Sequence, residues 1–390
     1  MMNDTETKID LTMKKSIIGL VLIVSVCVNG TGCSKQEIRR EDPPAGQTPS
    51  SEGYETDYRF FRNGLSSVDI GEARKVLLDF RNFNNGINAK VLTNLEGKRQ
   101  DYRNGLASHI GVGFKEQEKA RNILETFLDE LTEASKNPSA GAFAREGKIG
   151  IVQVSHDEQR LVNEKGVELG QVIQKMMIGA LQVANIEHFL MKSLEADNQA
   201  VMEGGNSTAM EHYWDIAWGY LGSINADPDR ISPLFLANYI EKEAVGMKGL
   251  ENINVAVYHA FQAGRKAIVG NRTDEVRKQV GEIRGLLSKM LVLRTMFYLN
   301  ESSKILRQKS GNELNEQYFH HMGEALGFIL ALPFVKNANG DYFITMDQAK
   351  ELYDALTQGE KGIWDKERIE GNQAGSIIEV NKKIKAYYHI

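Results

Sequence analysis

Cysteine is almost absent from this 390-residue chain, and both copies lie near the N-terminus, at Cys27 and Cys33. The sequence beyond them therefore contains no disulfide and no thiolate ligand. Any metal site in that part must use His, Asp, Glu, Tyr or backbone oxygen. Chemistry that needs a cysteine nucleophile is excluded there.

Proline is scarce as well, because only four of the seven prolines follow residue 58. Few helix breakers and long apolar patterns with a 3.6-residue period predict helices. We expect them near residues 69–83, 114–135, 166–193, 208–221, 232–243, 252–268, 274–307, 313–332, 346–357 and 374–388. Long helices with short loops favour antiparallel bundles, so the predicted fold class is all-α.

The predicted helical body covers residues 58–390, which is long for a single core. Residues 222–233 are rich in turn-forming residues and would divide the body into two packed sub-bundles. Only Lys148–Ser155 shows an alternating pattern, which fits either a hairpin arm or an extended loop.

An excess of positive charge is also missing. The chain has 47 Lys and Arg residues against 52 Asp and Glu residues, a net charge of −5. Nucleic-acid binding needs clustered Lys and Arg, so the charge balance argues against it.

The N-terminus has the pattern of a secretory leader. Two lysines after Met13 precede a short apolar run, Ile17–Val28, and small residues lead to Cys33. The run is short for a membrane span. Acidic residues among the first twelve suit a leader poorly, so we expect Met13 to be the start and residues 1–32 the signal peptide.

Cys33 is the predicted lipidation site, because Gly30-Thr31-Gly32-Cys33 resembles a lipobox. Cys27 is an alternative acceptor, and a secreted protein without lipid is another reading. Residues 33–57 are rich in Pro, Gly, Ser and Gln, which predicts a flexible tether. The expected location is the bacterial cell envelope, most simply the outer membrane.

Residues 210–221 (MEHYWDIAWGYL) are apolar around most of the helix, which predicts burial. Glu211, His212 and Asp215 form a narrow polar seam on this helix. Buried charged groups need partners, because an unpaired buried charge is costly.

Residues 319–332 (FHHMGEALGFILAL) form a second such helix, with His320, His321 and Glu324 on one side. Gly327 and Ala331 lie in line with these side chains and would let another helix approach closely. Glu168 and several other polar residues occur on the predicted helix 166–193, where they fit a polar channel or a solvated face.

Paired imidazole and carboxylate groups on helices suit a metal site in a bundle core. The candidate ligands are His212, Asp215, His320, His321 and Glu324, with Glu211 and Glu168 in the adjoining polar seams. The alternative is a set of structural ion pairs. If the two seams face each other across the bundle, they could share one ion, either iron or another divalent metal.

Several blocks of the sequence resemble an uncharacterised group of bacterial helical lipoproteins that are distant relatives of the imelysins. The blocks are GALQVANIEHFL, LEADNQAV, MEHYWDIAWGYLG, GRKAI and HHMGEALGFILAL, which lie between residues 179 and 332. The resemblance implies two helical bundles in an envelope protein of iron acquisition. The imelysin motif G-x-H-x-x-E would fall on His321 and Glu324, or on His212 and Asp215, but its glycine is absent in both places.

Three functions follow as hypotheses. The first is an envelope lipoprotein that binds iron, haem or an iron carrier, or that assists an outer-membrane iron transporter, with a membrane receptor as partner. The second is a metal-dependent peptidase, which needs an open metal position beside a substrate cleft. The third is a non-catalytic structural or interaction lipoprotein. Of these, an enzyme is the less favoured class, and no catalytic residue is assigned.

Overall fold

The computed structural model of the protein describes residues 58–88, 92, 94–137, 139–155, 158–223, 233–244, 246–308 and 316–390. The predicted signal peptide, the lipidation site at Cys33 and the tether lie outside these described residues. The described residues belong to one compact unit, Tyr54–Ile390. The predicted boundary at 222–233 falls largely on residues 224–232, which are not described.

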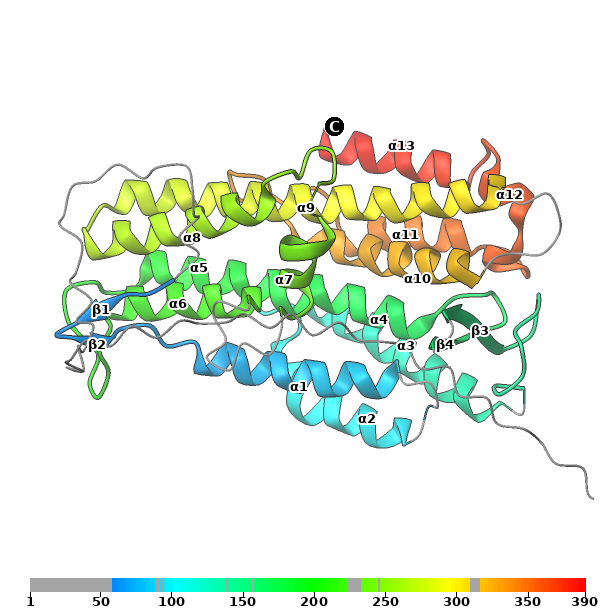
Figure 1. Cartoon of the computed structure of the whole chain (residues 1–390), viewed down its shortest axis with the longest axis horizontal. Helices are drawn as coiled ribbons and strands as arrows, with labels where there is room; N and C mark the ends of the chain where they lie inside the picture. The colour runs from blue at the N-terminus through cyan, green and yellow to red at the C-terminus, as the bar shows by residue number, and fades with distance from the viewer. Residues whose placement is uncertain are drawn as a thin grey trace, which may run out of the picture. The chain divides into compact units, whose positions relative to one another are not determined.

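Helices make up most of the described body (Figure 1), which confirms the all-α prediction. The α-helices are α1 Gly71–Ile87, α2 Leu95–Asp101, α3 Gln117–Lys136, α4 Leu169–Met177, α5 Ala184–Glu195, α6 Ala209–Leu221, α7 Leu236–Asn238, α8 Ile253–Val269, α9 Thr273–Gln308, α10 Glu316–Ala331, α11 Met346–Thr357, α12 Lys366–Glu370 and α13 Ile377–Tyr388. Single turns of π-helix occur at Tyr102–Leu106, Ile178–Val183 and Tyr239–Glu243, and 3₁₀ turns at Ala107–His109, Leu332–Phe334 and Gly362–Trp364.

Two small antiparallel hairpins are the only sheets among the described residues. β1 Phe61–Arg62 pairs with β2 Leu65–Ser66, and β3 Gly150–Ser155 pairs with β4 Glu158–Val162. In the second hairpin Ile151 lies opposite Leu161. The segment Lys148–Ser155 therefore contains a hairpin arm, which was one of its two predicted forms.

The packing of the long helices explains the arrangement in Figure 1. α9 packs along both α8 and α10, α4 packs on α10, and α5 packs on α6. α4 and α5 continue one another through the π-helical turn Ile178–Val183. With about 1.5 Å per residue, the 36 residues of α9 span roughly 54 Å. α9 is thus long enough for both α8 and α10 to pack along it.

Small residues on α10 permit close packing, as the sequence predicted. A Cβ on Gly327 would lie 2.7 Å from the Lys175 Cβ and 2.7 Å from the Val172 carbonyl oxygen. Farther along, a Cβ on Gly179 would lie 2.7 Å from Ala331. The helix that approaches α10 is therefore α4 with its π-helical continuation, and not α6.

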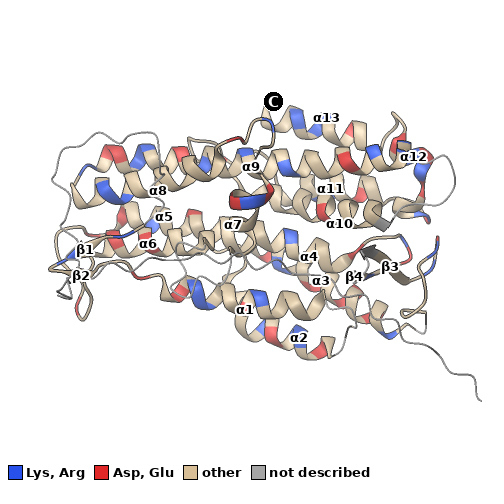
Figure 2. Cartoon of the chain, viewed as in Figure 1, with Lys and Arg blue, Asp and Glu red and all other residues tan. Residues whose placement is uncertain are grey.

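α6 is buried because almost every face of it is apolar, and most of its ribbon in Figure 2 is in the colour of uncharged residues. Its N-terminus has a capping box, in which Thr208 and Glu211 each satisfy a backbone N–H of the other. Its other end is Gly222, which adopts a left-handed conformation at φ 77°. On the α8 side, Gly264 leaves room for the Trp214 ring, since a Cβ there would lie 1.9 Å from it. The described residues include no helix with the length and apolarity needed to cross a membrane.

Candidate functional site

The polar seam of α6 meets a buried arginine. Arg265 on α8 is fully buried, and it donates from Nε to Asp215 at 2.9 Å and from Nη1 to Glu211 at 2.7 Å. Tyr58 donates its hydroxyl to Asp215 at 2.6 Å. Arg62 pairs with Glu211 at 2.8 Å. Together with Ser67, which accepts from Arg265 at 3.1 Å, these residues form what we call the Arg265 cluster.

The Arg265 cluster fastens three parts of the chain together. Its carboxylates come from α6, its central cation from α8, and its other donors from the segment that holds β1 and β2. Burial would lower the pKa of Arg265, but Asp215, Tyr58 and Glu211 outweigh it and raise that pKa. Burial raises the pKa of Asp215 to about 7, although Arg265 and Tyr58 oppose the rise. Asp215 therefore depends on Arg265 and the Tyr58 hydroxyl to keep its charge in the buried site.

The polar seam of α10 meets a buried lysine on α4. Lys175 pairs with Glu324 at 3.2 Å and donates to Gln171 at 2.6 Å. Glu324 also accepts from the hydroxyl of Tyr239 at 3.2 Å. His320 lies between two carboxylates, with its Nδ1 at 2.9 Å from Glu168 and its Nε2 at 3.9 Å from Glu324. Adding Arg160, which pairs with Glu168 at 3.1 Å, completes what we call the Lys175 cluster.

The two histidines of α10 have opposite environments. Burial would lower the pKa of His320, but Glu168 and Glu324 outweigh it and raise that pKa. Burial lowers the pKa of His321, and Glu324 only partly opposes this. The Nδ1 of His321 is buried and has no hydrogen-bond partner. His320 is thus placed to carry a positive charge, and His321 to stay neutral.

The predicted metal ligands do not come together at one ion. Asp215 and Glu211 belong to the Arg265 cluster, whereas His320 and Glu324 belong to the Lys175 cluster. His212 is half-buried, and among the described residues its side chain has only a ring contact, with Tyr213. Within the described ranges no group of three or more His, Cys, Asp and Glu side chains is placed to hold a metal ion.

The expectation of one ion shared between the two seams is therefore wrong. The physical reason is that Arg265 and Lys175 already supply the positive charge that these carboxylates need. A resident metal does not fit the described residues for the same reason. Asp215, Glu211, His320 and Glu324 instead form ion pairs within the protein, as the structural alternative predicted. The pairing of His320 with Glu168 joins two predicted polar residues across a helix interface.

A separate groove has a cavity volume of about 710 Å³ and is lined by none of the residues of the two clusters. One face of α3 and one face of α11 line it, at helical spacing, and Asn163–Val167 closes a third side. The lining residues from the two helices are Ile123, Thr126, Phe127, Glu130, Glu133, Ala134, Asn137, Lys350, Tyr353, Asp354 and Thr357.

The two helices meet at their N-terminal ends and leave the groove beyond. Glu116, just before α3, accepts from the backbone N–H of Met346 at 2.9 Å, and Lys119 pairs with Asp347 at 2.7 Å. Farther along, the rings of Phe127 and Tyr353 are in contact, with centroids 5.3 Å apart. These contacts therefore join α3 and α11 on the side of the groove.

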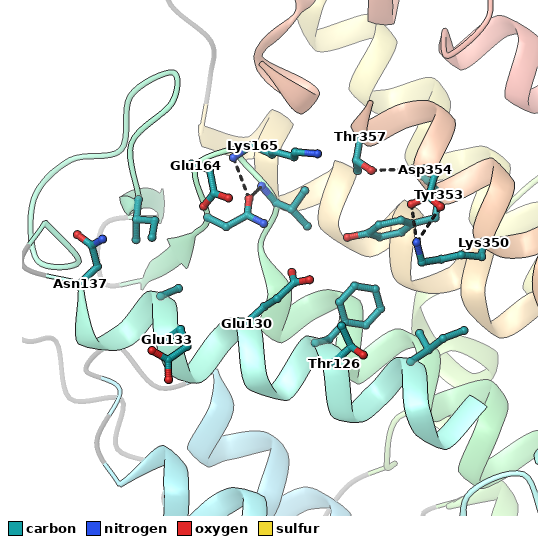
Figure 3. A pocket seen from close by; sticks show the side chains of 16 residues that line it. Thr126, Glu130, Glu133, Asn137, Glu164, Lys165, Lys350, Tyr353, Asp354 and Thr357 are labelled. Atoms are coloured by element: carbon teal, nitrogen blue, oxygen red, sulfur yellow. Dashed lines mark hydrogen bonds and ion pairs between the residues drawn. The ribbon is translucent and has the colours of Figure 1, made fainter. Parts of the chain in front are cut away.

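Figure 3 shows polar side chains directed into the groove from all three sides. Glu130 extends from α3, Glu164 from the loop before α4, and Tyr353 from α11 toward the same space. Lys350 is held by Asp354 at 2.6 Å. A concave site with an aromatic base and a few convergent polar groups is typical of small-molecule binding.

Sequence reasoning missed the groove and the two central cations. Arg265 was noted only within the GRKAI block, and Lys175 only as one polar residue of a long helix. A buried cation has no sequence signature of its own. The face of α3 alternates apolar and acidic residues as a solvated amphipathic helix does, so Glu130 gave no signal.

Comparisons with known proteins give a family and nothing beyond it. No curated protein and no solved structure matches the chain. The family described as "Domain of unknown function (DUF4856)" matches residues 55–390, which is the whole described body, and the chain therefore belongs to that family.

Proposed function

We propose that the protein is a non-catalytic binding protein of the bacterial cell envelope, with the groove between α3 and α11 as its ligand site. The observation that carries this proposal is the groove itself, a cavity of about 710 Å³ with an aromatic base and inward-directed polar groups. Its volume lies within the range of small-molecule sites, roughly 300–1,000 Å³. We retain lipid attachment through Cys33 and an outer-membrane location as parts of this proposal.

The resemblance to imelysin-like lipoproteins suggests which ligands to test first. Iron, haem or an iron carrier would link the protein to uptake, with an outer-membrane receptor as the partner. Bound iron alone is the least supported of the three, because the candidate ligands are already paired with Arg265 and Lys175. A carrier molecule in the groove needs no protein–metal bonds.

A peptidase is not supported by the described residues, which contain no group of His, Asp and Glu placed for a metal. The structural alternative has a specific observation in its favour. Both predicted seams serve as buried ion pairs that hold helices together. A binding protein needs a ligand site such as this groove, whereas a scaffold does not.

The experiment is native mass spectrometry of the full chain purified from envelopes, with metal analysis of the same sample. Thr126 is exposed and lines the groove, so Thr126→Trp should fill the groove at little cost to folding. The matched control is Asn122→Trp, an exposed position on α3 that does not line the groove. A co-purifying ligand that is lost in Thr126→Trp and kept in Asn122→Trp supports the proposal. A ligand that persists in both variants contradicts it.

A further inference from the structure

The side chain of Tyr353 is almost buried, but its hydroxyl opens into the groove. Tyr353 is 6% exposed, and among the described residues its hydroxyl makes no hydrogen bond. The hydroxyl is not one of the buried polar atoms that lack a partner, so water can reach it. Figure 3 shows this hydroxyl directed from α11 toward Glu130 and Glu164. It is therefore free to bond a polar group that enters the groove from outside.

Two exposed carboxylates that line the groove also lack partners within the described part of the chain. Neither Glu130 nor Glu164 forms an ion pair or a side-chain hydrogen bond there. Partial burial raises the pKa of Glu130 and repulsion from Glu164 adds to the rise, while Lys350 and Lys165 oppose it. By contrast, Asp354 is neutralised by Lys350 and Glu133 by Lys136. A positive charge placed between Glu130 and Glu164 would relieve their repulsion.

The backbone strengthens this negative potential. α3 ends at Lys136 and α11 ends at Thr357, and both helix ends border the groove. The C-terminal end of a helix carries roughly half a negative elementary charge. The lining has four carboxylates and two ammonium groups, and Lys136 next to the lining neutralises Glu133, which leaves an excess of one negative charge. An anionic ligand would meet net repulsion there.

The groove already holds one ammonium group in a manner that a ligand could copy. The Nζ of Lys350 lies 5.5 Å from the ring centroid of Tyr353 while it pairs with Asp354. Aromatic faces attract cations at this range. Phe127, whose ring contacts that of Tyr353, offers further apolar surface for methylene groups.

We infer that the groove binds an organic cation of the diamine or polyamine class. An ammonium group of the ligand pairs with Glu130 and Glu164 and donates an N–H to the Tyr353 hydroxyl. The methylene chain lies against Phe127. This inference rests on the proposed function, because it names the ligand class of the same groove.

The test is calorimetric titration of the full chain at low ionic strength with spermidine and cadaverine. Matched probes of the same chain length as cadaverine are 1,5-pentanediol, which is neutral, and glutarate, which is anionic. We expect the amines to bind and the other two probes not to bind. Glu130→Gln, Glu164→Gln and Tyr353→Phe should each weaken amine binding by about threefold, since partly exposed ion pairs and single hydrogen bonds are modest. Added salt should weaken it further.

Glu351→Gln is the matched control, because Glu351 is an exposed acid on α11 that does not line the groove. It should leave amine binding unchanged. Amine binding that is insensitive to all three groove variants would overturn the inference. Binding of glutarate or the diol that Thr126→Trp abolishes would overturn the cation class and leave the proposed function standing. If Thr126→Trp affects neither these probes nor any ligand from envelopes, the proposed function itself fails.

Discussion

The Arg265 cluster and the Lys175 cluster both bury carboxylates between helices, but they differ in the central cation and in its neighbours. Arg265 is fully buried and bonded to two carboxylates at once. Lys175 pairs with the single carboxylate of Glu324, which His320 and Tyr239 also approach. An arginine keeps its charge under all ordinary conditions, whereas lysine and histidine can lose theirs.

The Arg265 cluster therefore keeps its central positive charge at all ordinary pH values, whereas the charge of the Lys175 cluster depends on pH. Burial lowers the pKa of Lys175 despite the attraction of Glu324. The pKa of Glu324 is lowered because Lys175 and His320 outweigh its burial. In the Lys175 cluster several groups therefore stabilise the Glu324 carboxylate, and the loss of one leaves the others bound to it. In the Arg265 cluster a single cation, Arg265, bonds both carboxylates, and Arg62 adds a second ion pair to Glu211.

The largest effect should come from Arg265→Met. It removes the cation from between Asp215 and Glu211. Asp215 then keeps the hydroxyl of Tyr58, and Glu211 keeps Arg62 and the backbone N–H of Thr208. Removing one partner of a buried ion pair lowers the free energy of unfolding by about 3–5 kcal/mol. Urea unfolding should show this loss in the free energy of unfolding.

The matched control for Arg265→Met is the double variant Arg265→Met with Asp215→Leu. Replacing both members of a buried pair by apolar residues is often close to neutral. The double variant should therefore recover a large part of the stability that Arg265→Met loses. A double variant that is less stable than the single one would show that Arg265 acts mainly through other contacts.

Lys175→Met should cost less, about 2 kcal/mol, because Glu324 keeps His320 and Tyr239 as partners. Urea unfolding compared side by side with Arg265→Met measures the difference. The control is Lys175→Met combined with Glu324→Gln, which removes the uncompensated charge and should regain stability. Equal losses at Lys175 and Arg265 would contradict the proposed difference between the clusters.

The variant His320→Gln should change how the free energy of unfolding depends on pH. The fold raises the pKa of His320, so its charge stabilises the protein below the ordinary value near 6.5. That contribution is lost as the pH rises through the raised pKa. At pH 6 the variant should be about 1.5 kcal/mol less stable than the parent protein, because a hydrogen bond to a charged group is lost. The difference should shrink toward pH 9 in urea unfolding.

His321→Gln provides the opposite control. The pKa of His321 is lowered, so the folded state favours the neutral ring, and its contribution is present above pH 6.5 and lost as the pH falls. The charged groups that act on the His320 ring are Glu168, Glu324 and Lys175. Those that act on the His321 ring are Glu324, His320, Glu301 and Arg294. If both variants show the same pH trend, the assignment of charge to His320 is wrong.

The helices could be predicted because their signal is local. The predicted helix 346–357 has the bounds of α11, and 252–268 is within one residue of α8 at each end. The π-helical turn Ile178–Val183 was not predicted, because all six of its residues are buried and show no separate apolar face. The small residues Gly327 and Ala331 predicted close packing, but they did not identify the partner helix.

The site was harder to predict because it depends on which helices meet. The seams on α6 and α10 were found as polar residues on apolar helices, and their burial followed from that pattern. Their partners, Arg265 and Lys175, are 50 and 149 residues away from Asp215 and Glu324 along the chain. Helical periodicity contains no information on such pairings. The groove residues were missed because each is ordinary on its own helix.

The smallest effect should come from Tyr353→Phe, in comparison with Tyr58→Phe. Both changes remove one hydroxyl from a buried tyrosine and keep the ring. The Tyr58 hydroxyl donates to Asp215 at 2.6 Å, so its loss should cost about 1.5–3 kcal/mol, as for a hydrogen bond to a charged group. The Tyr353 hydroxyl has no partner among the described residues, so its loss should change stability by less than about 0.5 kcal/mol. Urea unfolding without added ligand measures both. A loss at Tyr353 as large as that at Tyr58 would mean that the hydroxyl is a structural group, and the groove would then lose the feature that marks it as a ligand site.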